Sequence, residues 1–394
     1  MDFSTDRSWS CYPEGLQPTR RAFLRTLAAA AAVAGTSFPA VASGENSSPG
    51  DEPIPAFPPG GFPKGSVQLN FNENPLGPSK KVIAAILENG FADANRYNYI
   101  DPLIEAVAHH HDMPFENVLV GCGSTEFLQF TPWAFLQDGG NIVLPTPSYG
   151  WSAGVAETMG RRTIRVPLGR DGTVDTVAMK KAVSRDTRIL YVANPNNPTG
   201  AHIPHEEIVG LAEALPPGAV LMVDEAYHDF LFDGDHAFEL VRQGAPVLVL
   251  RTFSKAYGMA GLRLGYAIGS NSVLGKLRTV SWGDFGINTA ARIAGPAALA
   301  DQEHVRSYIE VIDKGLVQLR SGLQELGFKP YRHRAPFFMV DFERPTHEMV
   351  RALFERQIFV QPGSNWGMPT FMRISVGSPN DNSTFLRAIH ELVS

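Results

Sequence analysis

The sequence has little cysteine, no excess of positive charge and no long hydrophobic run. It contains two cysteines, Cys11 and Cys122, among 394 residues. Forty Asp and Glu outnumber 34 Lys and Arg, so the formal net charge is -6 and no basic surface is available to hold nucleic acid. Hydrophobic residues make up 44% of the chain and charged residues 19%, as in a globular protein with a sizeable core, and the length suits about two domains.

The first 42 residues differ in kind from the rest. Arg20 and Arg21 are adjacent and are followed by Ala-Phe-Leu-Arg, and residues 26–42 form an uncharged, alanine-rich stretch that ends in Ala-Val-Ala. This pattern resembles a twin-arginine (Tat) export signal cleaved after Ala42. It predicts transport by the Tat translocase to the periplasm or the exterior, where Cys122 would be the only cysteine and no internal disulfide could form. The alternatives are a buried helix or a membrane anchor, but a span needs about 20 apolar residues, so no stable anchor is expected.

Three further regions follow. Residues 43–75 are rich in Ser, Pro and Gly and are typical of a linker with an N-terminal arm. Residues 76–300 alternate helical patterns with short β-rich runs, which predicts an α/β fold with a mostly parallel sheet covered by helices on both faces. Residues 301–394 carry long helical stretches and two apolar runs, which predicts a smaller α+β domain. The β-rich runs of the larger region are 118–120, 142–144, 189–192, 220–223, 247–250 and 264–268.

One helix can be placed more closely. Ser79 is a plausible N-cap, and the glycine at position 90 is a plausible stop. Val82, Ile83 and Ile86 are then expected on one side of this helix.

Three motifs follow the predicted strands at their carboxyl ends, where ligands collect in such sheets. Asn197 lies in Asn-Pro-Asn-Asn-Pro-Thr-Gly, Asp224 and Tyr227 lie in Asp-Glu-Ala-Tyr, and Lys255 lies in Thr-Phe-Ser-Lys with Arg263 eight positions on. A lysine flanked by hydroxyls, with a second cation nearby, suits a Schiff base with an aldehyde cofactor that carries a phosphate. Over residues 70–393 the chain resembles the pyridoxal-phosphate (PLP) aminotransferases of fold type I (class I/II), and most closely their histidinol-phosphate aminotransferase branch.

The resemblance implies a large PLP-binding domain, a small C-terminal domain and a set of residues around the cofactor. Lys255 would form the Schiff base and carry the proton between the substrate α-carbon and the cofactor. Asp224 would keep the pyridine nitrogen protonated, while Asn197 and Tyr227 would hydrogen-bond the phenolic oxygen. The catalytic set is therefore Lys255, Asp224 and Tyr227. The other cofactor-binding positions are Gly123, Ser124 and Thr125 in a turn that opens a helix, Tyr149 stacked on the ring, and Thr252, Ser254 and Arg263 around the phosphate.

Substrate and partner contacts are implied in the same way. Arg373 matches the arginine that clamps the substrate α-carboxylate, since a guanidinium offers a planar two-point match. Asn197, Asn72 and Asn74 are expected near the substrate, which would be an amino acid and a 2-oxo acid. Tyr97 matches a tyrosine that reaches the cofactor phosphate of the neighbouring subunit, which predicts a homodimer.

Alternatives remain at two points. Another PLP reaction on the same scaffold, such as decarboxylation of a phosphorylated amino acid or a racemase-like or cyclising activity, competes with transamination, and a non-catalytic PLP-binding module is a third possibility. An exported enzyme would not meet a cytoplasmic imidazole phosphate. We therefore expect this chain to share the reaction type of the histidinol-phosphate aminotransferases but not their substrate. The arm contains Phe57-Pro58-Pro59-Gly60 where that branch has Tyr-x-Pro-Gly.

Three consecutive histidines, His109, His110 and His111, invite a metal interpretation. Consecutive side chains point in different directions on a helix, and no other ligands are spaced to join them. We therefore expect a solvated helix end and no metal site.

Overall fold

The computed structural model describes residues 58, 60–89, 94–97, 99–231, 236–332 and 334–394. Every element below belongs to the compact unit Gly60–Ser394. The predicted export signal, its predicted cleavage position and two residues of the Phe-Pro-Pro-Gly element, Phe57 and Pro59, lie outside the described residues. Among the helices within the described ranges, none has both the length and the apolar character needed to cross a membrane.

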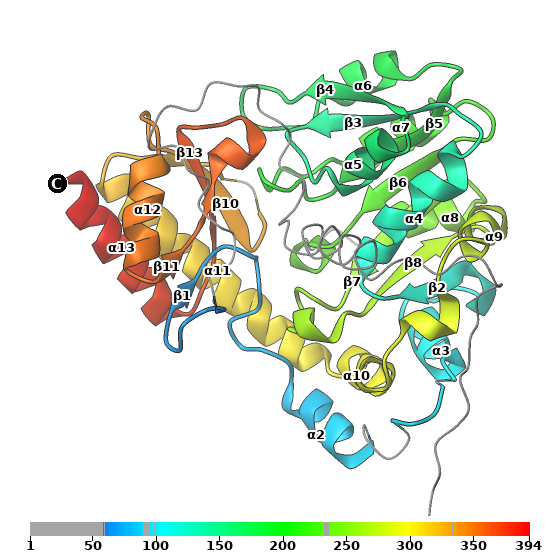
Figure 1. Ribbon diagram of the computed structural model, residues 1–394, viewed down its shortest axis with the longest axis horizontal. Coiled ribbons are helices and arrows are strands. Elements are labelled where there is room, and N and C mark those ends of the chain that lie inside the picture. Colours follow the sequence, from blue (N-terminus) through cyan, green and yellow to red (C-terminus); the bar gives the residue numbers. More distant parts are fainter. Residues whose placement is uncertain (1–57, 59, 90–93, 98, 232–235, 333) are drawn as a thin grey trace, which may run out of the picture. The chain divides into compact units, whose positions relative to one another are not determined.

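A seven-stranded sheet forms the centre of the larger region (Figure 1). Its strands are β2 (Val118–Gly121), β3 (Asn141–Thr146), β4 (Arg162–Pro167), β5 (Thr187–Ala193), β6 (Val220–Asp224), β7 (Val247–Thr252) and β8 (Gly265–Gly269). They lie in the order β2-β8-β7-β6-β5-β3-β4. Strands β4, β3, β5, β6 and β7 run parallel, and β8 is antiparallel to both β7 and β2.

The predicted α/β class and mostly parallel sheet are confirmed. The apolar runs in the sequence missed one strand of this sheet, β4. It is an edge strand in which only Val166 is buried. Because β4 meets solvent along much of its length, it needs no apolar run and leaves no clear signal in the sequence.

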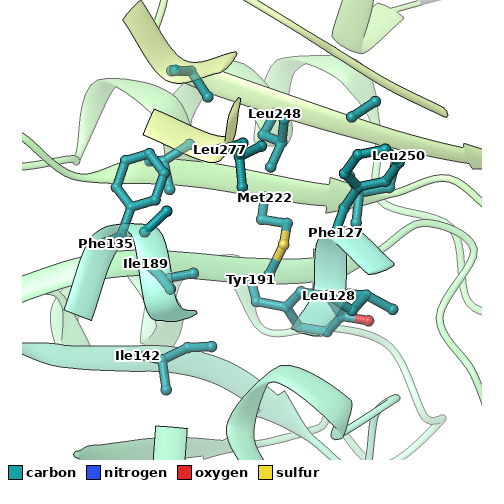
Figure 2. Packing of buried hydrophobic residues seen from close by; sticks show 14 of the residues in the cluster. Phe127, Leu128, Phe135, Ile142, Ile189, Tyr191, Met222, Leu248, Leu250 and Leu277 are labelled. Atoms are coloured by element: carbon teal, nitrogen blue, oxygen red, sulfur yellow. The ribbon is translucent and has the colours of Figure 1, made fainter. Parts of the chain in front are cut away.

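Helices cover both faces of this sheet. They are α3 (Asp101–His110), α4 (Ser124–Leu136), α5 (Trp151–Thr158), α6 (Thr176–Ala182), α7 (His205–Glu213), α8 (His236–Arg242), α9 (Asn271–Arg278) and α10 (Thr289–Leu299). Ile142, Ile189 and Met222 pack with side chains of α4, α5 and α9 in one buried cluster (Figure 2). Arg251 points to the opposite face, where its guanidinium carbon lies 4.9 Å from the ring centroid of Phe238 on α8. Strands enclosed in this way are apolar on both sides, which is why they could be recognised as apolar runs in the sequence.

A second, antiparallel sheet follows α11 (Gln302–Glu325). Its order is β12-β13-β10-β9. The strands are β9 (Lys329–Pro330), β10 (Phe337–Asp341), β12 (Gln361–Pro362) and β13 (Phe371–Ser375), accompanied by α12 (His347–Glu355) and α13 (Pro379–Val393). The helix α13 begins at Pro379, where Ser378 and Asp381 form a capping box and the proline occupies the first turn.

The arm residues join the second sheet region rather than the first. Strand β1 (Val67–Gln68) pairs in parallel with β11 (Ile358–Phe359). The helix α2 (Lys80–Asn89) begins as expected, with Ser79 Oγ accepting a hydrogen bond from the Val82 amide at 3.2 Å. The expected apolar side is only partly correct: Val82 is buried, but Ile83 is 45% exposed. The predicted stop at position 90 lies outside the described residues.

Candidate active site

Five strand ends bring the predicted residues to one edge of the large sheet. Gly123 follows β2, Tyr149 follows β3, Asn197 follows β5, Asp224 ends β6 and Lys255 follows β7. Strand β2 points the same way as the parallel strands, because β8 between them is antiparallel to both neighbours. The site therefore lies outside the carboxyl ends of the strands, as expected for an open α/β sheet.

One side of this edge is shaped to hold an anion. Gly123 precedes α4 with φ +75°, and a Cβ there would lie 2.5 Å from Arg263 Nη2. Arg263 Nη1 donates to Ser254 Oγ at 3.4 Å, and Thr252 Oγ1 donates to the same oxygen at 2.9 Å. A Cβ on Gly265 would lie 2.3 Å from the Ser124 amide, so the helix start lies against this strand. A helix N-terminus, two hydroxyls and an arginine together form a phosphate site.

Glu126 supports the same turn and was not among the predicted residues. Its Oε2 accepts from the Cys122 amide at 2.6 Å, and its Oε1 accepts from the Trp282 amide at 3.2 Å. Burial raises the pKa of its carboxyl group, while the two amide donors oppose that rise. Glu126 thus ties the anion-binding turn to the segment around Trp282. Thr125, which precedes it, is half-buried.

Asp224 supplies a buried carboxylate at the centre of the edge. Tyr191 Oη donates to Asp224 Oδ2 at 3.3 Å, and the Ala226 amide donates to Oδ1 at 3.2 Å. Burial raises the pKa of Asp224 to about 6, against the effect of these two donors. Tyr191 was not predicted as a site residue, because a tyrosine inside an apolar strand carries no functional signal in the sequence.

Lys255 is an unusually acidic lysine. Its Nζ donates to the Phe71 carbonyl at 2.7 Å and lies 5.8 Å from the ring centroid of Tyr227. Burial and then the charge of Arg373 lower the pKa of Lys255 to about 8, while Glu73 acts in the opposite direction. An amine with this pKa is partly neutral near pH 7, as a nucleophile or proton carrier requires.

Arg373 reaches this site from β13. Its Nη1 donates to Asn197 Oδ1 at 2.6 Å, and its Nη2 donates to the Asn70 carbonyl. Phe337 and Trp366 lie near it, with their ring centroids 5.3 and 5.2 Å from the guanidinium carbon. Burial lowers the pKa of Arg373 to about 10.

The guanidinium of Arg373 has no counterion among the described residues. Its Nε has no hydrogen-bond partner in the described part of the chain, and no carboxylate there pairs with the group. A buried cation without a counterion is costly unless a ligand supplies one. This geometry suits a carboxylate or phosphate ligand.

Asn72 and Asn74 use their carboxamides within the protein. Asn72 Nδ2 donates to Tyr227 Oη at 2.9 Å, and Ser375 Oγ donates to Asn72 Oδ1 at 2.7 Å. Asn74 Nδ2 donates to the Ala256 carbonyl at 3.0 Å, and its Oδ1 accepts from the Leu76 amide at 2.8 Å. Both residues therefore hold the arm segment against the site.

Two tyrosines complete the predicted set. Tyr149 is half-buried at the edge, and burial together with Asp224 raises the pKa of its phenol. Tyr97 is 88% exposed, with its ring centroid 5.3 Å from that of Phe285.

The histidine run has a different role from the one expected. His111 is buried, and its Nε2 is hydrogen-bonded to Tyr266 Oη at 2.8 Å. The interpretation as a solvated helix end is therefore wrong for His111, because α3 ends at His110 and the following turn directs His111 inward. In the ranges that the structure describes, no group of three or more His, Cys, Asp or Glu is placed to hold a metal ion.

The site as a whole is built for a phosphorylated aldehyde cofactor and an anionic substrate. An acidic lysine, a buried carboxylate and a phosphate site lie at adjacent strand ends, and an arginine without a counterion joins them. The profile of the family described as aminotransferase class I and II matches residues 64–389, and the chain belongs to this family. The residues fit its cofactor, PLP, so the protein is a PLP-dependent aminotransferase.

Individual relatives agree with this assignment. The chain is 35% identical over 339 residues to a histidinol-phosphate aminotransferase of Moorella thermoacetica, which covers 84% of this chain and 86% of that protein. It is 36% identical over 325 residues to one of Symbiobacterium thermophilum, covering 82% and 89%. Among solved structures, the histidinol-phosphate aminotransferase of Sinorhizobium meliloti in complex with pyridoxal-5'-phosphate matches with a TM-score of 0.76 and 26% identity, over 82% of this chain and 90% of that one.

Proposed function

We propose that this aminotransferase moves an amino group between an amino acid and a 2-oxo acid, with Lys255 as the covalent anchor of the cofactor. The observation that carries the proposal is the buried Arg373 without a counterion beside the acidic Lys255. The guanidinium of Arg373 can bind a carboxylate, and the amine of Lys255 can attack a carbonyl carbon. A transaminase needs both groups in one site.

Each neighbouring residue has a part in this proposal. Bound PLP supplies an aldehyde that takes up amino groups and a protonated ring that accepts electrons from the substrate α-carbon. Asp224 would hold the proton on the ring nitrogen, since it is the buried carboxylate of the site. Lys255 would hold the cofactor and would carry the substrate α-proton, and its lowered pKa suits it to accepting and giving up that proton. Asn197 and Tyr227 would hydrogen-bond the phenolic oxygen, and Tyr149 would pack on the ring.

Histidinol phosphate is the second candidate substrate. It is named by the relatives from Moorella thermoacetica and Symbiobacterium thermophilum. The fork of Arg373 is also compatible with it, because a guanidinium binds phosphate and carboxylate with the same two-point geometry. The amino-acid reaction is preferred because an exported enzyme would meet amino acids rather than a biosynthetic phosphate.

A donor screen tests both candidates. Purified protein loaded with PLP would be incubated with single amino acids, or with histidinol phosphate, together with 2-oxoglutarate. We expect oxo-acid formation from at least one amino acid at a higher kcat/KM than from histidinol phosphate. Release of carbon dioxide without formation of an oxo acid would instead support the decarboxylase alternative.

We further propose that the enzyme is a homodimer in which Tyr97 completes the partner's site. Tyr97, Phe285, Trp282 and Leu87 are exposed hydrophobic side chains on segments before and after the large sheet, and an exposed set of this kind marks an interface. Mixing Tyr97→Ala with Lys255→Ala subunits would create heterodimers with one intact site. Activity is expected to return to about a quarter of the wild-type value in a statistical mixture. No recovery, in a mixture shown to exchange subunits, would contradict a shared site.

Export by the Tat route is the third part of the proposal. It rests on Arg20, Arg21 and the alanine-rich stretch that ends at Ala42. The Tat route carries folded proteins, which suits a cofactor that is installed in the cytoplasm. Changing Arg20→Lys and Arg21→Lys together should leave active, PLP-loaded precursor in the cytoplasm. Cell fractionation and N-terminal sequencing would check this, and unaltered delivery of the double variant would indicate another route.

A further inference from the structure

Asn72 has an unusual backbone conformation for a residue in the interior. Its φ is +55°, in the left-handed region that residues other than glycine rarely occupy, and its side chain is 1% exposed. Such a conformation persists only where the surroundings determine it, and it is concentrated at functional sites. The contacts of Asn72 show what determines it here.

Asn72 is bonded twice to Ser375. The Asn72 amide donates to Ser375 Oγ at 2.9 Å, and Ser375 Oγ donates back to Asn72 Oδ1 at 2.7 Å. With its oxygen engaged in this way, Asn72 uses Nδ2 to donate to Tyr227 Oη at 2.9 Å. The Tyr227 oxygen is therefore an acceptor toward Asn72, and no acceptor for its own hydroxyl hydrogen is present in the described part of the chain. The Tyr227 hydroxyl is therefore available to donate a hydrogen bond to a ligand.

The segment around Asn72 is fastened to the strand that carries the carboxylate clamp. Arg373 and Ser375 are two residues apart on β13, so their side chains share a face. The Ser375 amide donates to the Leu69 carbonyl at 2.9 Å, and Arg373 donates to the Asn70 carbonyl.

The same segment is also fastened to the cofactor side. Lys255 donates to the Phe71 carbonyl, and Asn74 donates to the Ala256 carbonyl. Residues 69–74 thus form a strap between the substrate clamp and the cofactor-binding loop, and Asn72 is its contact with Tyr227.

We propose that Asn72 is a positioning residue that links Ser375 to the Tyr227 hydroxyl, and so aims the proton of Tyr227 at the phenolic oxygen of the cofactor. This inference rests on the proposed role of Tyr227.

Several other groups face Tyr227 and must be held constant in a test. Arg373, Asp224 and Lys255 are the charged neighbours, and the Phe337 ring centroid lies 4.9 Å from that of Tyr227. Burial raises the pKa of Tyr227, while Arg373 and the hydrogen bond from Asn72 lower it. A change at Asn72 or Ser375 leaves all of these neighbours in place.

Substitutions at position 72 separate backbone strain from hydrogen bonding. Asn72→Gly permits the left-handed conformation but removes the donor, whereas Asn72→Asp keeps the shape and turns the donor into an acceptor for the Tyr227 proton. In PLP-loaded protein, the pH midpoint of the cofactor absorbance change should rise by about 0.5 to 1 unit in Asn72→Gly, the equivalent of one lost hydrogen bond. It should rise further in Asn72→Asp. The midpoint should rise because a hydrogen-bond donor to the phenolic oxygen favours loss of the titrating proton, and these substitutions weaken the Tyr227 donor.

Ser375 provides the other end of the test. Ser375→Ala should shift the midpoint in the same direction by a smaller amount, and Ser375→Thr, which keeps the hydroxyl, should restore it. Thr346→Val is the matched control, because it removes a hydroxyl that donates to the Pro369 carbonyl at 3.1 Å elsewhere in the same region. This control should leave the midpoint unchanged even if the protein loses stability.

A double-mutant cycle decides the question. In a Tyr227→Phe background, Asn72→Gly should have no further effect on the midpoint or on the dissociation constant for PLP. Equal shifts with and without the Tyr227 hydroxyl would overturn the proposed link. If Tyr227→Phe alone leaves the cofactor spectrum unchanged, the proposed role of Tyr227 fails instead, so the two failures are distinguishable.

Discussion

Arg373→Lys tests the assignment that carries the proposed function. In the structure, Arg373 uses Nη1 for Asn197 and Nη2 for the Asn70 carbonyl, and its Nε has no partner in the described residues. Phe337 and Trp366 lie near the guanidinium, within 5.3 Å of its carbon. Lysine keeps the charge but loses the planar fork, so a substrate carboxylate would be bound through one contact rather than two.

The magnitude follows from the loss of one charge-assisted hydrogen bond. Such a bond contributes about 1.5 to 3 kcal/mol, which corresponds to a drop of roughly 10- to 150-fold in kcat/KM for amino acids. We expect most of the loss to appear as a higher KM, because the contact is made in the bound substrate as well as in the transition state. The PLP dissociation constant should change by less than about threefold, since the phosphate site is formed by Ser124, Thr252, Ser254 and Arg263.

Steady-state kinetics with varied amino acid and fluorescence titration of the apoenzyme with PLP would measure the two quantities. Arg320→Lys is a matched control, because the Arg320 guanidinium carbon lies 5.6 Å from the ring centroid of Phe338, the strand neighbour of Phe337. Successive residues of a strand point to opposite faces, so this control makes the same chemical change away from the site. An unchanged KM together with a collapse of PLP affinity would refute the role given to Arg373.

Three further predictions concern the cofactor side. Lys255→Ala should lower turnover by more than about 10⁴-fold and abolish borohydride-trappable attachment of PLP, because it removes both the anchor and the proton carrier; wild-type-like turnover would contradict the mechanism. In the apoenzyme, the rate of covalent PLP attachment should rise with pH and level off above about 8, since the neutral amine is the nucleophile and the pKa of Lys255 is lowered to about 8; a midpoint near 10 in stopped-flow absorbance would refute this. Gly123→Ala should weaken PLP binding about 10-fold by strain at φ +75° and displacement of Arg263, whereas Gly160→Ala, at φ +69° with open space around it, should lower only the melting temperature.

The sequence by itself determined the fold class and most of the site. Strands enclosed on both faces must be apolar throughout, so runs such as 220–223 and 247–250 were visible without a structure. The polar residues that follow these runs could be recognised as site candidates for the same reason. A carboxylate, a carboxamide or a lysine that follows a buried run lies at a strand end, where ligands bind in such sheets. Lys255, Asp224 and Asn197 all meet at that edge in the structure.

Tertiary structure decided what depends on contacts between distant segments. The carboxamides of Asn72 and Asn74 were expected near the substrate, but only the folded chain shows them bonded to Tyr227 and to the Ala256 carbonyl. His111 looked like part of a polar helix end until Tyr266, far along the chain, was found to meet it. Glu126, Tyr191 and Ser375 act through hydrogen bonds whose partners are set by packing. Local periodicity reports which face of an element is buried, whereas the partner of a buried polar group is fixed only when remote elements pack together.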